Sequence, residues 1–307
     1  MKIVFMGTPS FAVPVLKALS EKYEVVLVVS QPDRAKKKNQ IIKTPVHEAA
    51  CELGLNIIQP ESIKDSYEKI KNANADVLVS AAYGQYIPTK ILKLFKKTLN
   101  VHGSLLPKHR GGAPIQRCLI NGDTKTGITI IEMAKKLDAG KMYAKREYEI
   151  LETDNNTSLF EKLSIIGRDL LLEVIEDVYN DVNLGVEQNE DEVTFSSNIT
   201  KEEEKISFND TSLNIFNKIR GLSLEPGAYL EHKNIKLKVF ASKIVETDVD
   251  CIPGTVLCVK KKIVIKTLDK AIELTSVLMP GKKIMTGQEF SNGQKLFELN
   301  DVIQEVQ

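Results

Sequence analysis

The 307-residue sequence contains no tryptophan and only four histidines and four cysteines. Its four cysteines include no Cys-x-x-Cys pair, which argues against both a metal site and a disulfide framework. We therefore expect no bound metal. Each cysteine stands beside apolar residues, so we expect buried free thiols at Cys51, Cys118, Cys251 and Cys258.

Long hydrophobic segments and a dinucleotide-binding motif are also missing. No segment approaches the roughly 18 uncharged apolar residues that a membrane span requires, and the apolar start at residues 2–7 is too short for a secretory signal. We expect a cytoplasmic protein with no membrane partner. The segment Gly7-Thr8-Pro9-Ser10 does not match Gly-x-Gly-x-x-Gly, so no dinucleotide site is predicted.

Charge is distributed unevenly along a chain whose net charge is only +1. Residues 1–145 carry 23 basic and 12 acidic side chains, whereas residues 146–204 carry 4 and 17. Such a distribution suggests a positive working face for an anionic partner. From charge alone, a lysine-rich solvated surface explains it equally well.

Short apolar runs alternate with helical patterns through the first 120 residues. This alternation is typical of a Rossmann-like, doubly wound α/β domain with a parallel sheet, in which sites lie at the carboxyl ends of strands. Strands are predicted at 2–7, 24–30, 56–58, 76–80 and 98–102. Helices are predicted at 11–19, 45–53, 61–70, 88–94 and 114–120.

The remainder of the chain predicts a second, smaller domain. A capping box at Ser158 and Glu161 is predicted to begin a long amphipathic helix that closes the first domain. An acidic linker follows, with a strand at 193–195 docked back on that domain. After a helix at 211–220, a series of short strands predicts a small OB-like β-barrel. These strands are expected at 228–230, 235–241, 254–259, 262–266 and 271–278.

The most informative segment contains Asn100 and His102. They stand two residues apart at the end of a predicted strand, so their side chains leave the same face, and Gly103 then begins a loop. Two of the four histidines, His102 and His109, fall in this segment. An amide donor beside an imidazole suits oxyanion stabilisation and proton transfer. Taken singly, each is more often a strand-end cap or a core histidine.

Motifs spread over nearly the whole chain resemble the methionyl-tRNA formyltransferase family. The Asn-x-His-x-Ser-Leu-Leu-Pro segment with a downstream Asp is shared by enzymes that use 10-formyltetrahydrofolate, so the resemblance implies that formyl donor. The Gly-Thr-Pro-Ser-Phe start, the Ala-Pro-Ile-Gln-Arg segment and the C-terminal barrel imply initiator methionyl-tRNA as acceptor. The matching segments are 2–16, 100–107, 110–117, 137–142 and 280–283.

The resemblance also implies a domain division and catalytic roles. Residues 1–190 correspond to the formyltransferase catalytic domain, 191–206 to a linker and 207–307 to an OB-like domain that binds tRNA. Asn100 and His102 are expected to act with Asp138, which would orient the histidine and help to relay protons. Taken alone, Asp138 could equally form an Asx turn.

The two substrates are expected at two different loops. The folate-contacting loop corresponds to Ser104, Leu105, Leu106 and Pro107, with residues 82–86 as the opposite wall. The basic loop that engages the acceptor stem corresponds to Arg34, Lys36, Lys37, Lys38 and Lys43. Because Ala35 and Asn39 stand where the family loop carries glycines and a second arginine, we expect phosphate contacts rather than base readout. We expect a monomer that binds one tRNA.

Two other functions fit part of these observations. A formyltransferase that acts on a nucleotide-linked amino sugar shares the donor site and a C-terminal extension, but it has no need of the basic loop at 34–43. A non-enzymatic folate-binding or RNA-binding protein has no need of the combination of Asn100, His102 and Asp138.

Overall fold

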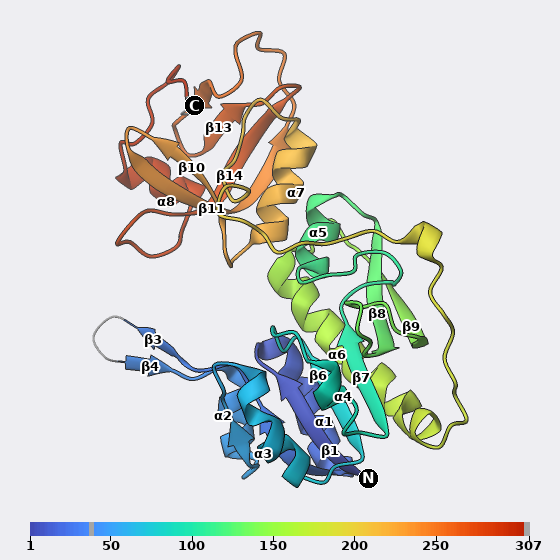
Figure 1. The fold of residues 1–307 in the computed structure, drawn as a ribbon. Coiled ribbons are helices and arrows are strands. Elements are labelled where there is room, and N and C mark those ends of the chain that lie inside the picture. Colours follow the sequence, from blue (N-terminus) through green and yellow to red (C-terminus); the bar gives the residue numbers. More distant parts are fainter. Residues whose placement is uncertain (37–39, 304–307) are drawn as a thin grey trace. The chain divides into compact units, whose positions relative to one another are not determined.

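The computed structural model describes residues 1–36 and 40–303, and the side chains of residues 35–40 lie outside that description (Figure 1). The chain folds into two compact units. The first unit comprises Met1–Pro114, Lys125–Glu149 and Phe160–Ser197. The second comprises the short segments Ile115–Thr124 and Ile150–Leu159 together with the chain from Asn198 onward.

The first unit contains a seven-stranded sheet in the order β5-β2-β1-β6-β7-β8-β9. The first five of these strands are parallel, which confirms the predicted parallel sheet, and β8 and β9 extend it with antiparallel pairing. The two antiparallel strands were not predicted. The strands are β1 (Lys2–Gly7), β2 (Glu24–Val29), β5 (Ile57–Ile58), β6 (Val77–Ala81), β7 (Lys97–His102), β8 (Lys125–Glu132) and β9 (Met142–Glu149).

Helices follow the parallel strands at the predicted places, although two are shorter than predicted. The helix predicted at 61–70 is a 3-10 turn followed by α3, and the helix predicted at 88–94 is one turn, α4. The elements are η1 (Ser10–Ala12), α1 (Val13–Lys22), α2 (Pro45–Glu52), η2 (Ile63–Ser66), α3 (Tyr67–Asn72), α4 (Thr89–Leu92), α5 (Pro114–Ile120) and η3 (Glu190–Glu192).

The long helix α6 (Asn156–Tyr179) begins earlier than predicted. The Ser158 N–H donates to Asn155 Oδ1 at 3.0 Å, and the Asn155 N–H donates to Ser158 Oγ at 3.1 Å. Asn155 therefore caps the helix, and the predicted capping box at Ser158 and Glu161 is wrong. The reason is that the amide oxygen of Asn155 takes the Ser158 N–H, which places Ser158 inside the first turn.

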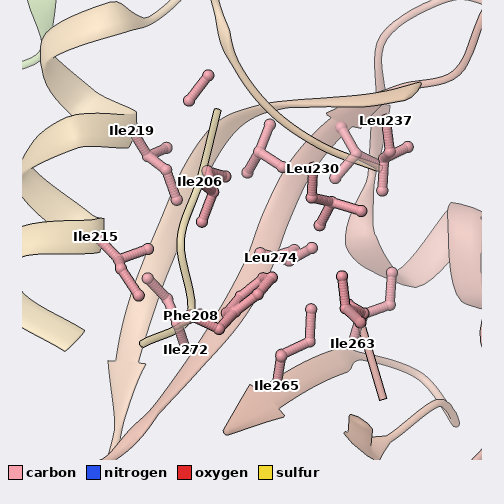
Figure 2. Packing of buried hydrophobic residues seen from close by; sticks show 14 of the residues in the cluster. Ile206, Phe208, Ile215, Ile219, Leu230, Leu237, Ile263, Ile265, Ile272 and Leu274 are labelled. Atoms are coloured by element: carbon pink, nitrogen blue, oxygen red, sulfur yellow. The ribbon is translucent and has the colours of Figure 1, made fainter. Parts of the chain in front are cut away.

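The second unit contains an antiparallel sheet that curls into a half-barrel, which confirms the predicted class of a small barrel-like C-terminal domain (Figure 1). Its path is β10-β11-β14-β13-β12, with β15 paired to β14. Buried side chains from α7, the strands and the segment before α7, among them Phe208, Ile219 and Leu274, fill its concave side (Figure 2). The elements are α7 (Ser212–Leu222), β10 (Ala228–His232), β11 (Ile235–Val245), β12 (Val256–Cys258), β13 (Ile263–Lys266), β14 (Ala271–Leu278), β15 (Met285–Thr286) and α8 (Gly287–Gly293).

The cysteines are less buried than the sequence predicted. Cys118 is buried, whereas Cys51 is exposed on α2 and Cys251 and Cys258 are partly exposed. The expectation of four buried thiols is therefore wrong, because three of these positions face outward despite their apolar neighbours. Within the described part of the chain, no helix is long and apolar enough to cross a membrane.

Candidate active site

The candidate site lies at the carboxyl end of β7, close to the point where the strand order of the first sheet reverses. β1 lies between β2 and β6, so the chain turns back across the sheet there, and ligands of such sheets bind outside the strand ends near this point. On β7, Asn100 pairs with Ser80 of β6, and His102 pairs with Thr129 of β8. Alternation along the strand gives Asn100 and His102 the same face.

The amide of Asn100 lies at the end of β7. The residue is half-buried, and no hydrogen bond joins its carboxamide to any residue that the structure describes. It therefore does not act as a strand-end cap. An N–H donor at a strand end is suited to hold a carbonyl oxygen or a developing oxyanion.

His102 is only 5% exposed, and a backbone carbonyl fixes its ring. Nε2 lies 3.0 Å from the carbonyl oxygen of His109. Because a carbonyl oxygen can only accept, Nε2 must carry the hydrogen, and Nδ1 is left as the nitrogen that can take up a proton.

Asp138 faces Nδ1 without a direct hydrogen bond. Its Oδ2 lies 3.7 Å from Nδ1 of His102, and the same oxygen accepts a hydrogen bond from the Gly111 N–H at 2.9 Å. The carbonyl of His109 therefore orients the ring, a task that the sequence assigned to Asp138. At this distance and in a buried setting, the carboxylate stabilises positive charge on the imidazole.

The segment Ser104-Leu105-Leu106-Pro107 is a loop that the side chain of Thr129 on β8 closes. Thr129 Oγ1 donates to the Ser104 carbonyl at 2.7 Å and accepts from the Leu106 N–H at 3.1 Å. Leu106, Pro107 and Ser104 are buried, and only Leu105 is half-buried. A ligand at this loop would therefore meet Leu105 first, because the other three residues expose little of their side chains or backbone. The role of these four residues stays a prediction.

The end of β6, predicted as the opposite wall, is divided between core and surface. Tyr83 is 3% exposed and packs in the core, and burial raises its pKa to about 12. Its carbonyl accepts from Thr8 Oγ1 at 2.9 Å. Tyr86 is exposed, and its hydroxyl donates to the Lys135 carbonyl at 3.3 Å. Only the exposed part of this segment can face a ligand.

The basic loop forms a hairpin of β3 (Arg34–Lys36) and β4 (Gln40–Ile42) that extends from the first unit (Figure 1). Arg34 and Lys43 are exposed at its two ends. The backbone of Lys36 lies in β3, its side chain is not among those described, and Lys37 and Lys38 lie outside the described residues.

Asp33 anchors the base of this hairpin. Its carboxylate accepts from the Thr44 N–H at 3.0 Å, from Gln59 Nε2 at 2.7 Å and from His47 Nδ1 at 2.8 Å. Burial raises the pKa of Asp33, but the hydrogen bonds from Gln59, Thr44 and His47 outweigh it and hold the pKa below its usual value. The base of the hairpin is thus tied to the start of α2 and to the residue that follows β5.

A segment of the predicted linker is part of the first unit. Phe195 forms a parallel bridge with Arg110, so the predicted docking of 193–195 is confirmed, although as a single bridge rather than a strand. Ser196 Oγ lies 2.7 Å from Nδ1 of His109, whose carbonyl holds His102. The segment thus supports the loop that orients the imidazole.

Sequence reasoning also missed a buried arginine and its partners. Arg110 is 1% exposed, and its guanidinium donates to Gln188 and Glu190. Hydrogen bonds from Arg110 and Lys136 lower the pKa of Glu190 to about 2. The sequence signal was Arg110 itself, next to two glycines. Nothing in the acidic segment, residues 180–205, marks which of its side chains contacts Arg110.

Comparison with known proteins identifies the family of this site. Residues 1–175 match the formyl transferase family. The chain belongs to this family. Residues 198–295 match the C-terminal domain of formyl transferases, so both units of this formyltransferase have counterparts in the family.

Full-length relatives and solved structures agree with this assignment. The formyltransferase is 46% identical to "Methionyl-tRNA formyltransferase" of Mycoplasma mycoides subsp. mycoides SC, over 98% of both chains. It shares the fold of a sugar 3N-formyl transferase solved with dTDP and 5-N-formyl-THF, at 20% identity and a TM-score of 0.68, over 92% of this chain and 99% of that one. It also covers 48% of the longer HypX chain of Aquifex aeolicus over 96% of its own length, at 18% identity and a TM-score of 0.69.

Proposed function

We propose that this formyltransferase moves the formyl group of 10-formyltetrahydrofolate to the free amino group of methionine on initiator methionyl-tRNA, for translation initiation. The observation that carries the chemistry is the Asn100 amide, which has no hydrogen bond to the described residues and lies on the same strand face as His102. Nδ1 of His102 faces Asp138 at 3.7 Å. The identity of 46% with a relative of that name, over nearly the full length of both chains, supports the acceptor.

The residues at the end of β7 fit a formyl donor. A formyl group presents one carbonyl oxygen, and the Asn100 amide has N–H donors to meet it. Leu105, in the loop after Gly103, and the exposed part of the β6 end offer surfaces for the pterin. We assign the folate to Ser104, Leu105, Leu106 and Pro107, with Leu105 as the half-buried side chain that a ligand can reach.

The transfer requires a proton acceptor, an oxyanion donor and a proton donor. As the methionine amine attacks the formyl carbon, Nδ1 of His102 takes the proton of the amine, and the Asn100 amide donates to the developing oxyanion. Asp138 stabilises the imidazolium so formed. The imidazolium then returns the proton to the leaving folate nitrogen, and the C–N bond breaks. The histidine ends in its starting state.

We assign the acceptor to the anchored hairpin. Arg34, Lys36, Lys37, Lys38 and Lys43 belong to it or flank it, and cations of this kind neutralise phosphates and draw the 3′ end of a tRNA toward the site. Asp33 holds the base of the hairpin, so the cations are carried on a support tied to the catalytic unit.

A comparison of acceptors tests this function. The protein is supplied with radiolabelled 10-formyltetrahydrofolate and either charged initiator methionyl-tRNA, uncharged tRNA or an amino-sugar nucleotide. We expect label to appear only on charged tRNA. Formylation of the sugar nucleotide in place of methionyl-tRNA would leave the donor chemistry standing and move the acceptor to a small molecule.

A further inference from the structure

One side chain from the acidic segment holds the backbone of the turn that carries Asp138. Gln188 Nε2 donates to the carbonyl of Asp138 at 2.7 Å and to the carbonyl of Gly140 at 2.8 Å. Gln188 is 8% exposed and reaches the turn from about fifty residues further along the chain. The two carbonyls lie on either side of Ala139, so one amide clamps the whole turn.

The oxygen of the same carboxamide is equally occupied. Gln188 Oε1 accepts from Arg110 Nε at 3.0 Å and from Arg110 Nη2 at 2.8 Å. Both N–H donors and both acceptor positions of Gln188 are therefore used by protein groups. The side chain therefore has no polar atom left to bind a substrate. The orientation of the amide is also fixed, because exchanging Oε1 and Nε2 would turn the NH2 group toward the N–H donors of Arg110.

The turn needs such a clamp because its backbone is unusual. Asp138 has φ of +50°, a left-handed conformation that non-glycine residues rarely adopt. Gly140 approaches the carbonyl of Glu132 so closely that a Cβ would lie 1.9 Å from that oxygen. A turn of this shape persists only where its surroundings hold it.

The contacts form a closed ring. Arg110 holds Gln188, Gln188 holds the backbone of Asp138, and the Asp138 carboxylate accepts from Gly111, the residue after Arg110. Gly111 has φ of +127°, and a Cβ there would lie 2.5 Å from the Ser196 carbonyl. The backbone and the carboxylate of Asp138 are thus fixed against the same two consecutive residues.

We propose that Gln188 is a positioning residue for Asp138: its two hydrogen bonds to the turn hold the carboxylate where it faces Nδ1 of His102. The inference rests on the proposed formyl transfer at His102 and Asp138. It gives the acidic segment a part in the reaction, although the segment touches no reacting atom.

The variant Gln188→Glu tests the clamp with little change in shape. A carboxylate can still accept from Arg110, but it cannot donate to the carbonyls of Asp138 and Gly140. We expect kcat to fall at least about tenfold, because displacement of a reacting group by about 1 Å can cost a hundredfold, while KM for folate and for tRNA stays within about twofold. Glu187→Gln, the opposite exchange at an exposed neighbour, should match the wild type.

A double-mutant cycle with Asp138→Asn separates positioning from general support of the fold. If Gln188 acts through Asp138, adding Gln188→Glu to Asp138→Asn should lower kcat by less than about twofold. Wild-type kcat in Gln188→Glu, or an undiminished loss in the Asp138→Asn background, would overturn the inference. Full activity of Asp138→Asn itself would instead count against the proposed mechanism. If Gln188→Glu is insoluble, Gln188→Met, which also lacks donors, should show the same cycle.

Discussion

At the scale of single residues, the proposed chemistry depends on which groups fix His102 and Asp138. The carbonyl of His109 fixes the protonated nitrogen of His102, and in the proposed mechanism Nδ1 exchanges the proton. Asp138 stands 3.7 Å away and is held by Gly111, so its contribution is its charge rather than the orientation of the ring. The division of tasks predicts a specific kinetic effect for removal of that charge.

We expect Asp138→Asn to lower kcat by about a hundredfold while the dissociation constant for folate changes little. The amide oxygen can still accept from Gly111, so the turn is kept, but the charge that stabilises an imidazolium is lost. Steady-state kinetics together with calorimetric titration of tetrahydrofolate measures both quantities. Asp65→Asn, at an exposed residue, is the matched control. Normal turnover with weakened folate binding would make Asp138 a structural turn residue only.

The residues that sequence patterns revealed and those they did not differ in a physical way. Asn100 and His102 could be placed on one strand face because strand periodicity is local. Gln188 could not be found, because its function depends on contacts with Arg110 and Asp138 across 78 and 50 positions of sequence. No local pattern records such a contact.

At the scale of elements, the hairpin β3–β4 combines an anchored base with the basic sequence from Arg34 to Lys43. Asp33 ties the base to Thr44, His47 and Gln59. The base of the hairpin is therefore held in place on the first unit, as the proposed role of presenting positive charges to tRNA requires. The proposal makes a quantitative prediction about salt.

We expect the combined replacement of Lys36, Lys37 and Lys38 with alanine to flatten the salt dependence of tRNA affinity. The slope of log K against log salt is negative, and its magnitude should decrease by about 0.7–0.9 for every phosphate that the variant no longer neutralises. Folate affinity should stay the same. Filter binding across a salt series measures the slope. Replacement of Lys64, Lys69 and Lys71, three exposed lysines of the η2–α3 segment, removes equal charge as a control. Equal slopes in the triple variant and the parent would reduce the hairpin to a solvated surface.

The types of most elements were predicted correctly, whereas an edge strand and the start of a helix were not. The parallel strands and the C-terminal antiparallel strands follow from apolar runs bounded by turn residues. β9 escaped notice because it is an edge strand in which exposed and half-buried residues alternate, so it lacks a continuous apolar run. The start of α6 was misplaced because the choice between Asn155 and Ser158 as the cap depends on hydrogen bonds, not on composition.

At the scale of the whole molecule, each unit gathers segments that are distant in the sequence. In the second unit, Arg117 of the segment Ile115–Thr124 donates to Glu203 of the later chain at 2.6 Å and 3.0 Å. The hydrogen bond from Arg117, with that of the Thr200 N–H, lowers the pKa of Glu203 from its usual 4.5 to about 2. This ion pair contributes to stability in a pH-dependent way.

Because the pKa of Glu203 is lowered in the folded state, its contribution to stability is present above about pH 4.5 and is lost as the pH falls toward 2. We therefore expect Glu203→Gln to lower the free energy of unfolding at neutral pH, with a difference from wild type that shrinks through this range. Urea unfolding at several pH values measures it. Glu204→Gln, at a side chain without a hydrogen bond among the described residues, is the control. A difference that does not change with pH would contradict the assignment.

The most direct test of the whole account is single-turnover formyl transfer to initiator methionyl-tRNA, with enzyme in excess over charged tRNA. We expect rapid transfer by the wild type, and transfer at least about a hundredfold slower by Asn100→Ala and by His102→Ala, the loss typical for removal of one oxyanion donor or proton acceptor. Both variants should fold and bind tRNA as the parent does, and Asn180→Ala, at an exposed residue beyond α6, should transfer at the parent rate. Parent-like transfer by a folded Asn100→Ala or His102→Ala, or no transfer by the wild type, would contradict the account.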